Sequence, residues 1–372
     1  MSGPRSRHVA LDCIGAHGKT DAMKALWVVP PELKRAASGN EPEQRLLSYW
    51  LASVRTRAAV AALEWKRSGN ENVFCDPAAM GTGEDIDWDA VSVCIVPKFY
   101  PSAPPEPWYQ VCATARNSGC PLLIDLCDYP FAMSPPVQSF YTEALKICDT
   151  VVVNSERMAE LMSSHISRRP IVIEDAILGE ARNPEFAPAG RLRLLWFGHP
   201  GNLRYLDHCL DGLVGFARRA SCRLTVVTAA GYGAEEAAQR IERQFRPALE
   251  ARFVEWSLES MAGALRRADL VLVPSDPKDP VKAGVSANRV AVTLWAGRFP
   301  VATPMPSYLA FSDGVWLGDN LIEGIQWALG NRIEVRARIR LGQAMVAEKF
   351  TPNRLGPQWC RLLESLALRR AA

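Results

Sequence analysis

Short apolar runs rich in β-branched residues recur along this chain, and each run ends in a polar or proline-containing segment. The clearest examples are Val91–Val96, Leu122–Leu126, Val151–Val153, Leu192–Phe197 and Leu270–Val273. Runs of this length are typical of parallel strands that helices bury on both faces. Stretches with helical spacing of apolar residues separate the runs. This alternation predicts an α/β fold with parallel, doubly wound sheets.

The length of the chain predicts two such sheets in two domains. A chain of 372 residues exceeds what a single hydrophobic core usually supports. The segment 183–190, NPEFAPAG, has the proline, glycine and alanine content of an interdomain linker. We therefore expect one Rossmann-like domain over residues 23–182 and a second over 191–343, facing each other across a cleft. Residues 1–22 are predicted to be a disordered extension.

Composition excludes several classes of protein. A net charge of +3 gives no domain-wide basic excess, which argues against nucleic acid as the default partner. The ten cysteines form no CxxC pair, which favours a reduced, cytoplasmic setting. No apolar run approaches the ~20 residues that span a bilayer. The arginines near the C-terminus are interpreted as solvated helix faces, with peripheral contact to an anionic inner membrane face as the alternative.

The segment from Ala268 to Met305 contains the most informative polar loop. A buried strand, Leu270–Val273, is stopped by Pro274 and followed by a polar loop reaching Gly284. Such a loop lies at the carboxyl end of its strand, where open α/β sheets bind ligands. Ser286 is the predicted N-cap of the next helix, which ends near Gly297. The helix therefore directs its N-terminus at the loop.

Two basic residues flank that predicted helix start. Arg289 lies one turn into the helix and Lys282 lies in the loop. A helix N-terminus favours an anion by about 0.3 to 1 kcal/mol, and each charge-assisted hydrogen bond would add roughly 1.5 to 3 kcal/mol. The pattern predicts a cradle for a diphosphate that needs no metal ion. An ordinary αβ unit with a solvated, charged loop is the alternative.

The motif SxNRxxxxxWAGRFPVA, preceded by ADLVLVPS, resembles the donor-nucleotide region of family-4-like glycosyltransferases of the GT-B fold. The resemblance implies that Arg289 lies near the diphosphate of a sugar nucleotide and that Ser286 and Asn288 surround the helix start. Many relatives carry two glutamates at the positions that correspond here to Gly284 and Val292. This sequence departs from the family at both positions. One of the loop carboxylates, Asp276 or Asp279, could replace the first glutamate only loosely.

A glycine-containing loop opens the second predicted domain. It reads GHPGN, and Gly198 and Gly201 would let a phosphate approach backbone N–H groups while His199 and Asn202 donate to it. The loop lacks the third small residue of a dinucleotide fingerprint, which disfavours NAD. It resembles the loop that opens the C-terminal domain of GT-B transferases and faces the donor phosphates. A simple turn role for His199 stays open as the alternative.

Aromatic and acidic residues are further candidates for ligand contact in the predicted cleft. In the resembling families the strand end at Trp256 lines the pocket of the nucleotide base, so Trp256 either stacks on a base or belongs to the core. Asp125 and Asp128 in IDLCDYPF either face the cleft or cap a turn, and Asp128 is the candidate for contact with a sugar or acceptor hydroxyl. Aromatic residues such as Trp50 and Trp65 are predicted to be core.

Taken with these residues, the resemblance implies a retaining glycosyltransferase that moves a sugar, in particular a hexose, from a nucleotide-diphospho-sugar to an acceptor hydroxyl. The acceptor would be a sugar, a lipid-linked molecule or a small molecule, in polysaccharide, glycolipid or glycoside synthesis. Asp128, Arg289 and Lys282 would carry the reaction without a further cofactor. The final helix, 344–372, would pack back on the first domain. A catalytically silent relative and a nucleotide-sugar epimerase or hydrolase are the alternatives.

Overall fold

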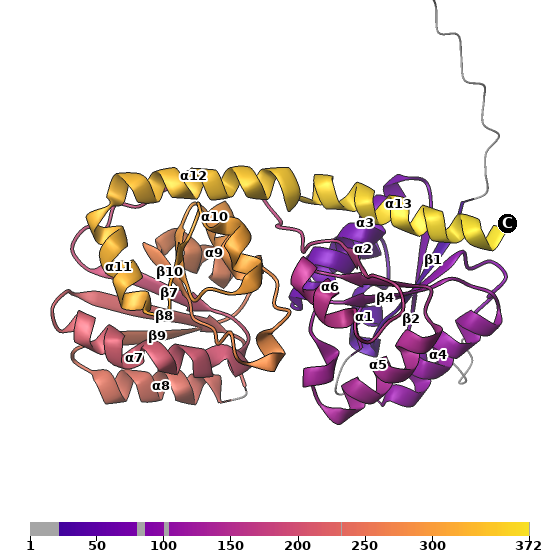
Figure 1. Ribbon diagram of the computed structural model, residues 1–372, viewed down its shortest axis with the longest axis horizontal. Coiled ribbons are helices and arrows are strands. Elements are labelled where there is room, and N and C mark those ends of the chain that lie inside the picture. Colours follow the sequence, from indigo (N-terminus) through magenta and orange to yellow (C-terminus); the bar gives the residue numbers. More distant parts are fainter. Residues whose placement is uncertain (1–21, 80–85, 100–103, 232, 372) are drawn as a thin grey trace, which may run out of the picture.

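The computed structural model describes residues 22–79, 86–99, 104–231 and 233–371. The extension predicted for residues 1–22 therefore lies outside the described residues, apart from Ala22. The described chain forms two six-stranded sheets in which every neighbouring pair of strands is parallel (Figure 1). The predicted α/β class with two doubly wound, Rossmann-like halves is confirmed.

The first half of the chain builds a sheet of strand order β2-β1-β3-β4-β5-β6. Its strands are β1 (Lys24–Val28), β2 (Glu71–Cys75), β3 (Val93–Val96), β4 (Leu122–Leu126), β5 (Thr150–Val153) and β6 (Ile171–Val172). Its helices are α1 (Pro31–Ala36), α2 (Pro42–Leu46), the π-helical turn η1 (Val54–Ala58), α3 (Ala59–Arg67), α4 (Pro105–Asn117), α5 (Pro135–Ile147) and α6 (Glu156–Met162).

The second half builds a sheet of order β12-β11-β10-β7-β8-β9. Its strands are β7 (Leu192–Phe197), β8 (Cys222–Thr228), β9 (Glu250–Glu255), β10 (Leu270–Val273), β11 (Phe299–Ala302) and β12 (Trp316–Leu317). Its helices are α7 (Leu203–Ala217), α8 (Ala234–Phe245), α9 (Leu258–Arg267), α10 (Asn288–Trp295), α11 (Leu321–Gly330) and α12 (Arg332–Lys349), and a last helix, α13 (Pro352–Ala371), follows.

Both faces of each sheet are buried, as the continuous apolar runs predict. In β10, Leu270 and Leu272 belong to one apolar cluster, whereas Val271 and Val273 belong to another. Alternate residues of β1 divide in the same way between two clusters. Because successive side chains of a strand point to opposite faces, helices must cover both sides of each sheet.

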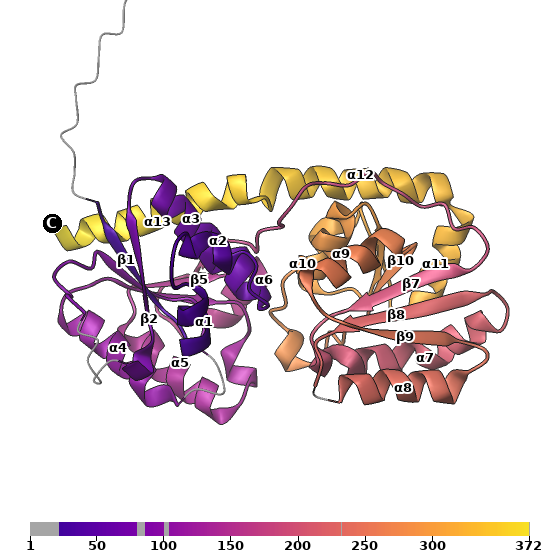
Figure 2. The ribbon, with the colours of Figure 1, turned by 180° about the vertical axis from the view of Figure 1, so that it is seen from behind.

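Two C-terminal helices run along the same side of both halves (Figures 1 and 2). Helix α12 contributes Val335 and Ile339 to the core of the second half and continues past the boundary predicted at residue 343. Helix α13 packs against α3 through residues such as Trp359 and Leu363, within the core of the first half. The chain therefore ends on the half in which it began.

The apolar spacing from Glu43 to Lys66 predicts one long helix, but the structure interrupts it. Helix α2 ends at Leu46, and helical structure resumes through the π-helical turn η1. Side chains of this turn bond to the backbone that precedes it: Thr56 Oγ1 donates to the Ala52 carbonyl, and Arg55 Nη1 donates to the Tyr49 carbonyl. These bonds stabilise the break, which no apolar spacing could reveal.

Candidate functional site

Helix α10 starts differently from the prediction. Its N-cap is Ala287, no side chain caps it, and its first residue is Asn288. The prediction that Ser286 caps this helix is therefore wrong, because the backbone turns into the helix one residue later. The first N–H groups of an uncapped helix have no side-chain acceptor. The N-terminus of α10 thus keeps its capacity to bind an anion.

Two buried polar atoms in the first turn of this helix, Arg289 Nη1 and Asn288 Oδ1, lack a partner among the described residues. The same holds for Ser275 Oγ, which follows β10, and for Ser307 Oγ, next to Tyr308 in the sequence. Arg289 Nη2 donates to the Tyr308 hydroxyl at 3.3 Å, and this is the one side-chain bond that the described chain gives the guanidinium. An unsatisfied buried polar group costs about 1–3 kcal/mol, so such a concentration indicates a ligand site.

Lys282 lies close to Arg289, as the sequence predicts. It ends the short helical turn η5 (Pro280–Lys282) in the loop after β10 and is partly buried. Burial lowers the pKa of Lys282, and the positive charge of Arg289 lowers it further. Two cations that destabilise each other are both stabilised when an anion arrives. The pair therefore favours a ligand with more than one negative charge.

The loop that carries Lys282 is tied to helix α7. Asp279 accepts hydrogen bonds from the Tyr205 hydroxyl and from Arg204 Nη2, and also from the backbone N–H of Val281 at 2.9 Å. The Lys282 ammonium lies 5.7 Å from the centre of the Tyr205 ring. These contacts hold the ammonium in one place. Asp279 thus has a local role in the loop, and it is not a free carboxylate.

Asp276, the other carboxylate of this loop, also serves the turn. Its Oδ1 accepts from the backbone N–H of Lys278 at 2.9 Å, an arrangement typical of an Asx turn. Gly284 packs against helix α6 of the other half, where an added Cβ would lie 2.5 Å from Met158 Cε. Met158 thus fills the space at the first glutamate position of the resembling family. Val292 packs into the apolar cluster beneath α10.

The glycine loop lies at the carboxyl end of β7, next to β10 in the sheet. His199 Nδ1 accepts from the backbone N–H of Gly201 at 3.2 Å, so His199 does serve the turn. Burial lowers the pKa of His199, and the charges of Lys282 and Lys98 lower it further. Gly198 packs on the Trp196 ring, and Asn202 precedes helix α7 without capping it. The loop therefore shares the electrostatic environment of Lys282.

Asp128 faces this region from the first half. It follows β4, is exposed, and forms an ion pair with Lys98 at 2.5 Å. Lys98 lowers the pKa of Asp128, and Lys282 and His199 of the second half lower it further. The carboxylate therefore binds a cation, and no backbone N–H of the described residues caps a turn with it. The candidates Asp128, Lys282 and His199, predicted from separate segments, interact electrostatically across the two halves.

Aromatic candidates divide between core and surface. Trp65 is fully buried, whereas Trp50 is 56% exposed, so the core prediction is wrong for Trp50. Trp256 is partly exposed just after β9, and the Arg55 guanidinium of the first half lies 5.1 Å from its ring centroid. Its ring thus contacts a residue of the other half.

Within the described residues, no group of three or more His, Cys, Asp or Glu side chains is arranged to hold a metal ion. In the same residues, no helix has the length and apolar character needed to cross a membrane. The basic C-terminal end is partly engaged, because Arg370 donates to the carbonyl groups of Val91 and Ser118.

No protein-family model and no curated protein sequence matches this chain. Solved structures do. HepE from Anabaena, solved in complex with UDP-glucose, superposes with a TM-score of 0.64 over 92% of this chain and 100% of its own, at 12% identity. A variant of TarM from S. aureus, solved with UDP, gives a TM-score of 0.53 over 73% of this chain and 55% of its own, at 10% identity.

A trehalose-6-phosphate synthase, studied for glycosyltransfer with retention, gives a TM-score of 0.52 over 74% of this chain and 73% of its own, at 13% identity. These neighbours are glycosyltransferases built from two Rossmann-like domains. The chain has the GT-B fold. At such low identity the likeness shows the architecture, and residue roles rest on the chain's own contacts.

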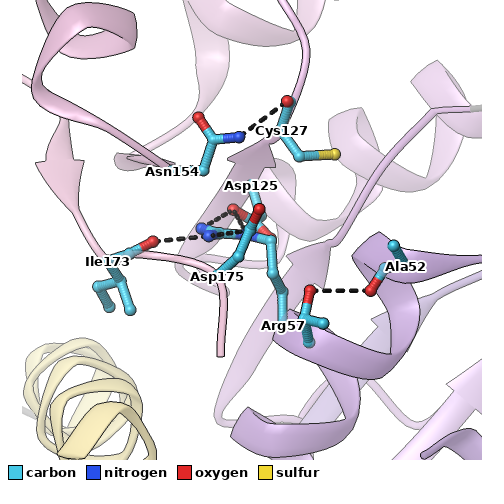
Figure 3. Close-up of polar contacts among 8 residues, drawn as sticks. Ala52, Arg57, Asp125, Cys127, Asn154, Ile173 and Asp175 are labelled. Atoms are coloured by element: carbon cyan, nitrogen blue, oxygen red, sulfur yellow. Dashed lines mark hydrogen bonds and ion pairs between the residues drawn. The ribbon is translucent and has the colours of Figure 1, made fainter. Parts of the chain in front are cut away.

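The N-terminal half of this GT-B fold contains an ion cluster that the sequence did not indicate (Figure 3). Arg57 of η1 is fully buried, binds both oxygens of Asp125, and binds Asp175 at 3.0 Å. Its Nη1 also donates to the Ile173 carbonyl at 2.6 Å. Asp125 is therefore a structural carboxylate, whereas Asp128, three residues later, is exposed.

Proposed function

We propose that this GT-B protein is a glycosyltransferase that transfers a sugar from a nucleotide-diphospho-sugar to an acceptor hydroxyl. The observation that carries the proposal is the pairing of two mutually destabilising cations, Lys282 and Arg289, beside an uncapped helix N-terminus. Arg289 Nη1 and the adjacent Asn288 Oδ1 are buried without a partner in the described chain. The solved complexes of GT-B neighbours with UDP or UDP-glucose support a nucleotide as the ligand.

In this proposal the second half binds the donor. Arg289, Lys282, the start of α10 and the Gly198 loop would neutralise the diphosphate as it leaves. Such groups accelerate the reaction only if they bind the developing charge more tightly than the charge of the intact donor. Side-chain cations would do here what a divalent metal does in other transferases, so we propose that the reaction needs no metal.

The first half would present the acceptor. Asp128 interacts electrostatically with Lys282 and His199, and its carboxylate would accept a hydrogen bond from a sugar hydroxyl. The exposed Trp50 offers an aromatic surface on the same half. We further propose transfer of a hexose with retention of configuration, in line with the retaining synthase among the structural neighbours. A cytoplasmic location with sugar, lipid-linked or small-molecule acceptors belongs to the same proposal.

Calorimetric titration of the purified protein with UDP, GDP, dTDP and ADP, and with CMP as a monophosphate, tests this function. Each titration is run with and without EDTA. We expect binding of at least one diphosphate, unchanged by EDTA, and weaker binding of the monophosphate. Failure of every diphosphate to bind would contradict the proposal and favour a catalytically silent GT-B protein. Loss of binding in EDTA would contradict only metal independence.

A further inference from the structure

The outer faces of α12 and α13 form one long surface of the molecule. The two helices have 18 and 20 residues, or roughly 27 and 30 Å at a rise of 1.5 Å per residue. They lie nearly end to end along the same side of both halves (Figures 1 and 2). Their inner faces belong to the two cores, through Val335 and Ile339 in α12 and through Trp359 and Leu363 in α13. The outer faces therefore point to the same side, away from both halves.

Apolar side chains lie on the outer face of α12, where a helix that covers a core normally carries polar residues. Ile333 is 78% exposed and Leu341, two turns later, is 56% exposed. The exposed Ala337 and Ala344 complete a stripe with spacings of 4, 4 and 3 residues. On α13, Leu368 is 62% exposed. Because the α12 residues share one helical face, they form a pattern and are not apolar residues scattered singly over a surface.

The same outer faces carry an excess of positive charge. Four exposed arginines there form no ion pair and no side-chain hydrogen bond with the described residues, namely Arg340, Arg354, Arg361 and Arg369. Of the exposed glutamates of α12, Glu334 is already paired with Arg338, which leaves Glu348. The surface therefore combines exposed apolar side chains with cations that the described chain does not neutralise.

This combination distinguishes between possible partners. A second copy of the chain would bring an equal positive charge to the contact, so the two faces would repel each other. A nucleic acid would bind the arginines through its phosphates, but it would leave Ile333, Leu341 and Leu368 without a partner. The surface of an anionic bilayer offers phosphates to the guanidinium groups and an acyl boundary to the apolar side chains. The charge and the apolar stripe together favour a membrane.

We propose that the outer faces of α12 and α13 bind the surface of a membrane that contains anionic phospholipids. Ile333, Leu341 and Leu368 would enter the boundary between headgroups and acyl chains, while the arginines bind lipid phosphates. The inner faces of both helices stay in the protein cores, so the helices would lie on the bilayer. None of these residues belongs to the proposed diphosphate site. The proposal therefore goes beyond the proposed function and does not depend on it.

Co-sedimentation of the full chain with lipid vesicles tests this proposal. We expect binding to vesicles of phosphatidylcholine and phosphatidylglycerol in equal amounts, weakening of that binding by added salt, and much weaker binding to phosphatidylcholine alone. The triple variant Arg340→Gln, Arg354→Gln, Arg361→Gln should bind the mixed vesicles about a hundredfold more weakly, because each basic residue near an anionic surface contributes roughly a factor of five. Ile333→Ser combined with Leu341→Ser should weaken binding roughly tenfold.

The matched control removes the same charge from another side of the molecule. Arg218, Arg219 and Arg243 are exposed, at the end of α7 and on α8. These two helices lie on the side of the second half opposite α12 (Figure 1). The triple variant Arg218→Gln, Arg219→Gln, Arg243→Gln should bind the mixed vesicles as the wild type does. All variants change exposed side chains, so each should keep the wild-type urea midpoint.

Three results would overturn the proposal. The first is a wild type that does not bind the mixed vesicles. The second is equal weakening by the two triple variants, which would show that net charge and not this surface causes the binding. The third is a concentration-dependent dimer that Ile333→Ser with Leu341→Ser abolishes while vesicle binding stays unchanged, which would assign the surface to a second copy of the chain.

Discussion

Arg57 and Arg289 carry the same charge in opposite surroundings. Arg57 has every side of its guanidinium occupied by Asp125, Asp175 and a backbone carbonyl (Figure 3). Arg289 has one long bond to a tyrosine hydroxyl, an unpartnered buried Nη1 among the described residues, and a second cation nearby. The comparison distinguishes an arginine that stabilises the fold from an arginine that is available to bind a ligand. Stability and binding should therefore respond in opposite ways when each is removed.

Removal of Arg57 should have the largest effect, and on stability. Burial alone would lower the pKa of Arg57, but Asp125 and Asp175 outweigh it and raise that pKa. Arg57→Met would leave the two carboxylates without their cation inside the protein. We expect a loss of about 3–5 kcal/mol in the free energy of unfolding, measured by urea denaturation at neutral pH.

The matched control for Arg57 is Arg240→Ala. Arg240 also binds an aspartate, Asp207, but its side chain is 56% exposed. An exposed ion pair contributes about 0–1 kcal/mol, so the control should unfold almost as the wild type does. Equal losses of unfolding free energy in the two variants would show that the buried Arg57 cluster stabilises the fold no more than an exposed ion pair does.

Arg289→Ala should show the reverse behaviour. Removing a cation whose Nη1 has no partner in the part of the chain that the structure describes should leave the unfolding free energy within about 0.5 kcal/mol of wild type. Loss of one charge-assisted contact of about 3 kcal/mol to the leaving diphosphate should slow turnover roughly a hundredfold. Parallel urea curves and steady-state rates measure both quantities. Near-normal turnover, or a stability loss as large as that of Arg57→Met, would contradict the proposed role of Arg289 in the site.

The two arginines also show what the sequence could predict. Arg289 was found from local patterns: a buried strand, a polar loop and a helix follow each other within one short segment. Strands β4, β7 and β10 have the predicted bounds for the same reason. Arg57 was missed because its partner Asp125 lies 68 residues away, and no local spacing records that contact. The Arg55 contact with Trp256 was missed for the same physical reason.

Elements with weak patterns were missed as well. Strand β2 reads ENVFC, is an edge strand and exposes its Glu71 and Val73 side chains, so it lacks the apolar run of the inner strands. Helix α8 carries many charges and few large apolar residues. The interrupted helix before α3 depends on side-chain bonds to backbone carbonyls. Such features follow from tertiary contacts, which override local propensity.

Glu174 is a partly buried carboxylate that forms no ion pair with the described residues, and its substitution should have the smallest effect. It is the acidic counterpart of Arg289, a charge without an opposite charge bound to it. The pKa of Glu174 is raised to about 8: burial is the largest cause, the charges of Asp175 and Glu156 add to it, and those of Arg57 and Lys349 only partly oppose it. In the unfolded chain the same group titrates near 4.5. Between these values the folded state holds a proton that the unfolded state releases.

Because the folded state binds more protons, stability should fall as pH rises from about 4.5 to about 8. Glu174→Gln fixes the neutral form, so it should match wild type at pH ~5 and exceed it at pH ~8 by on the order of 1–3 kcal/mol. Urea midpoints at the two pH values measure the difference, and Glu143→Gln on the surface is the control. A pH slope that survives the substitution unchanged would mean that other groups cause it, and it would contradict the raised pKa of Glu174 in the folded protein.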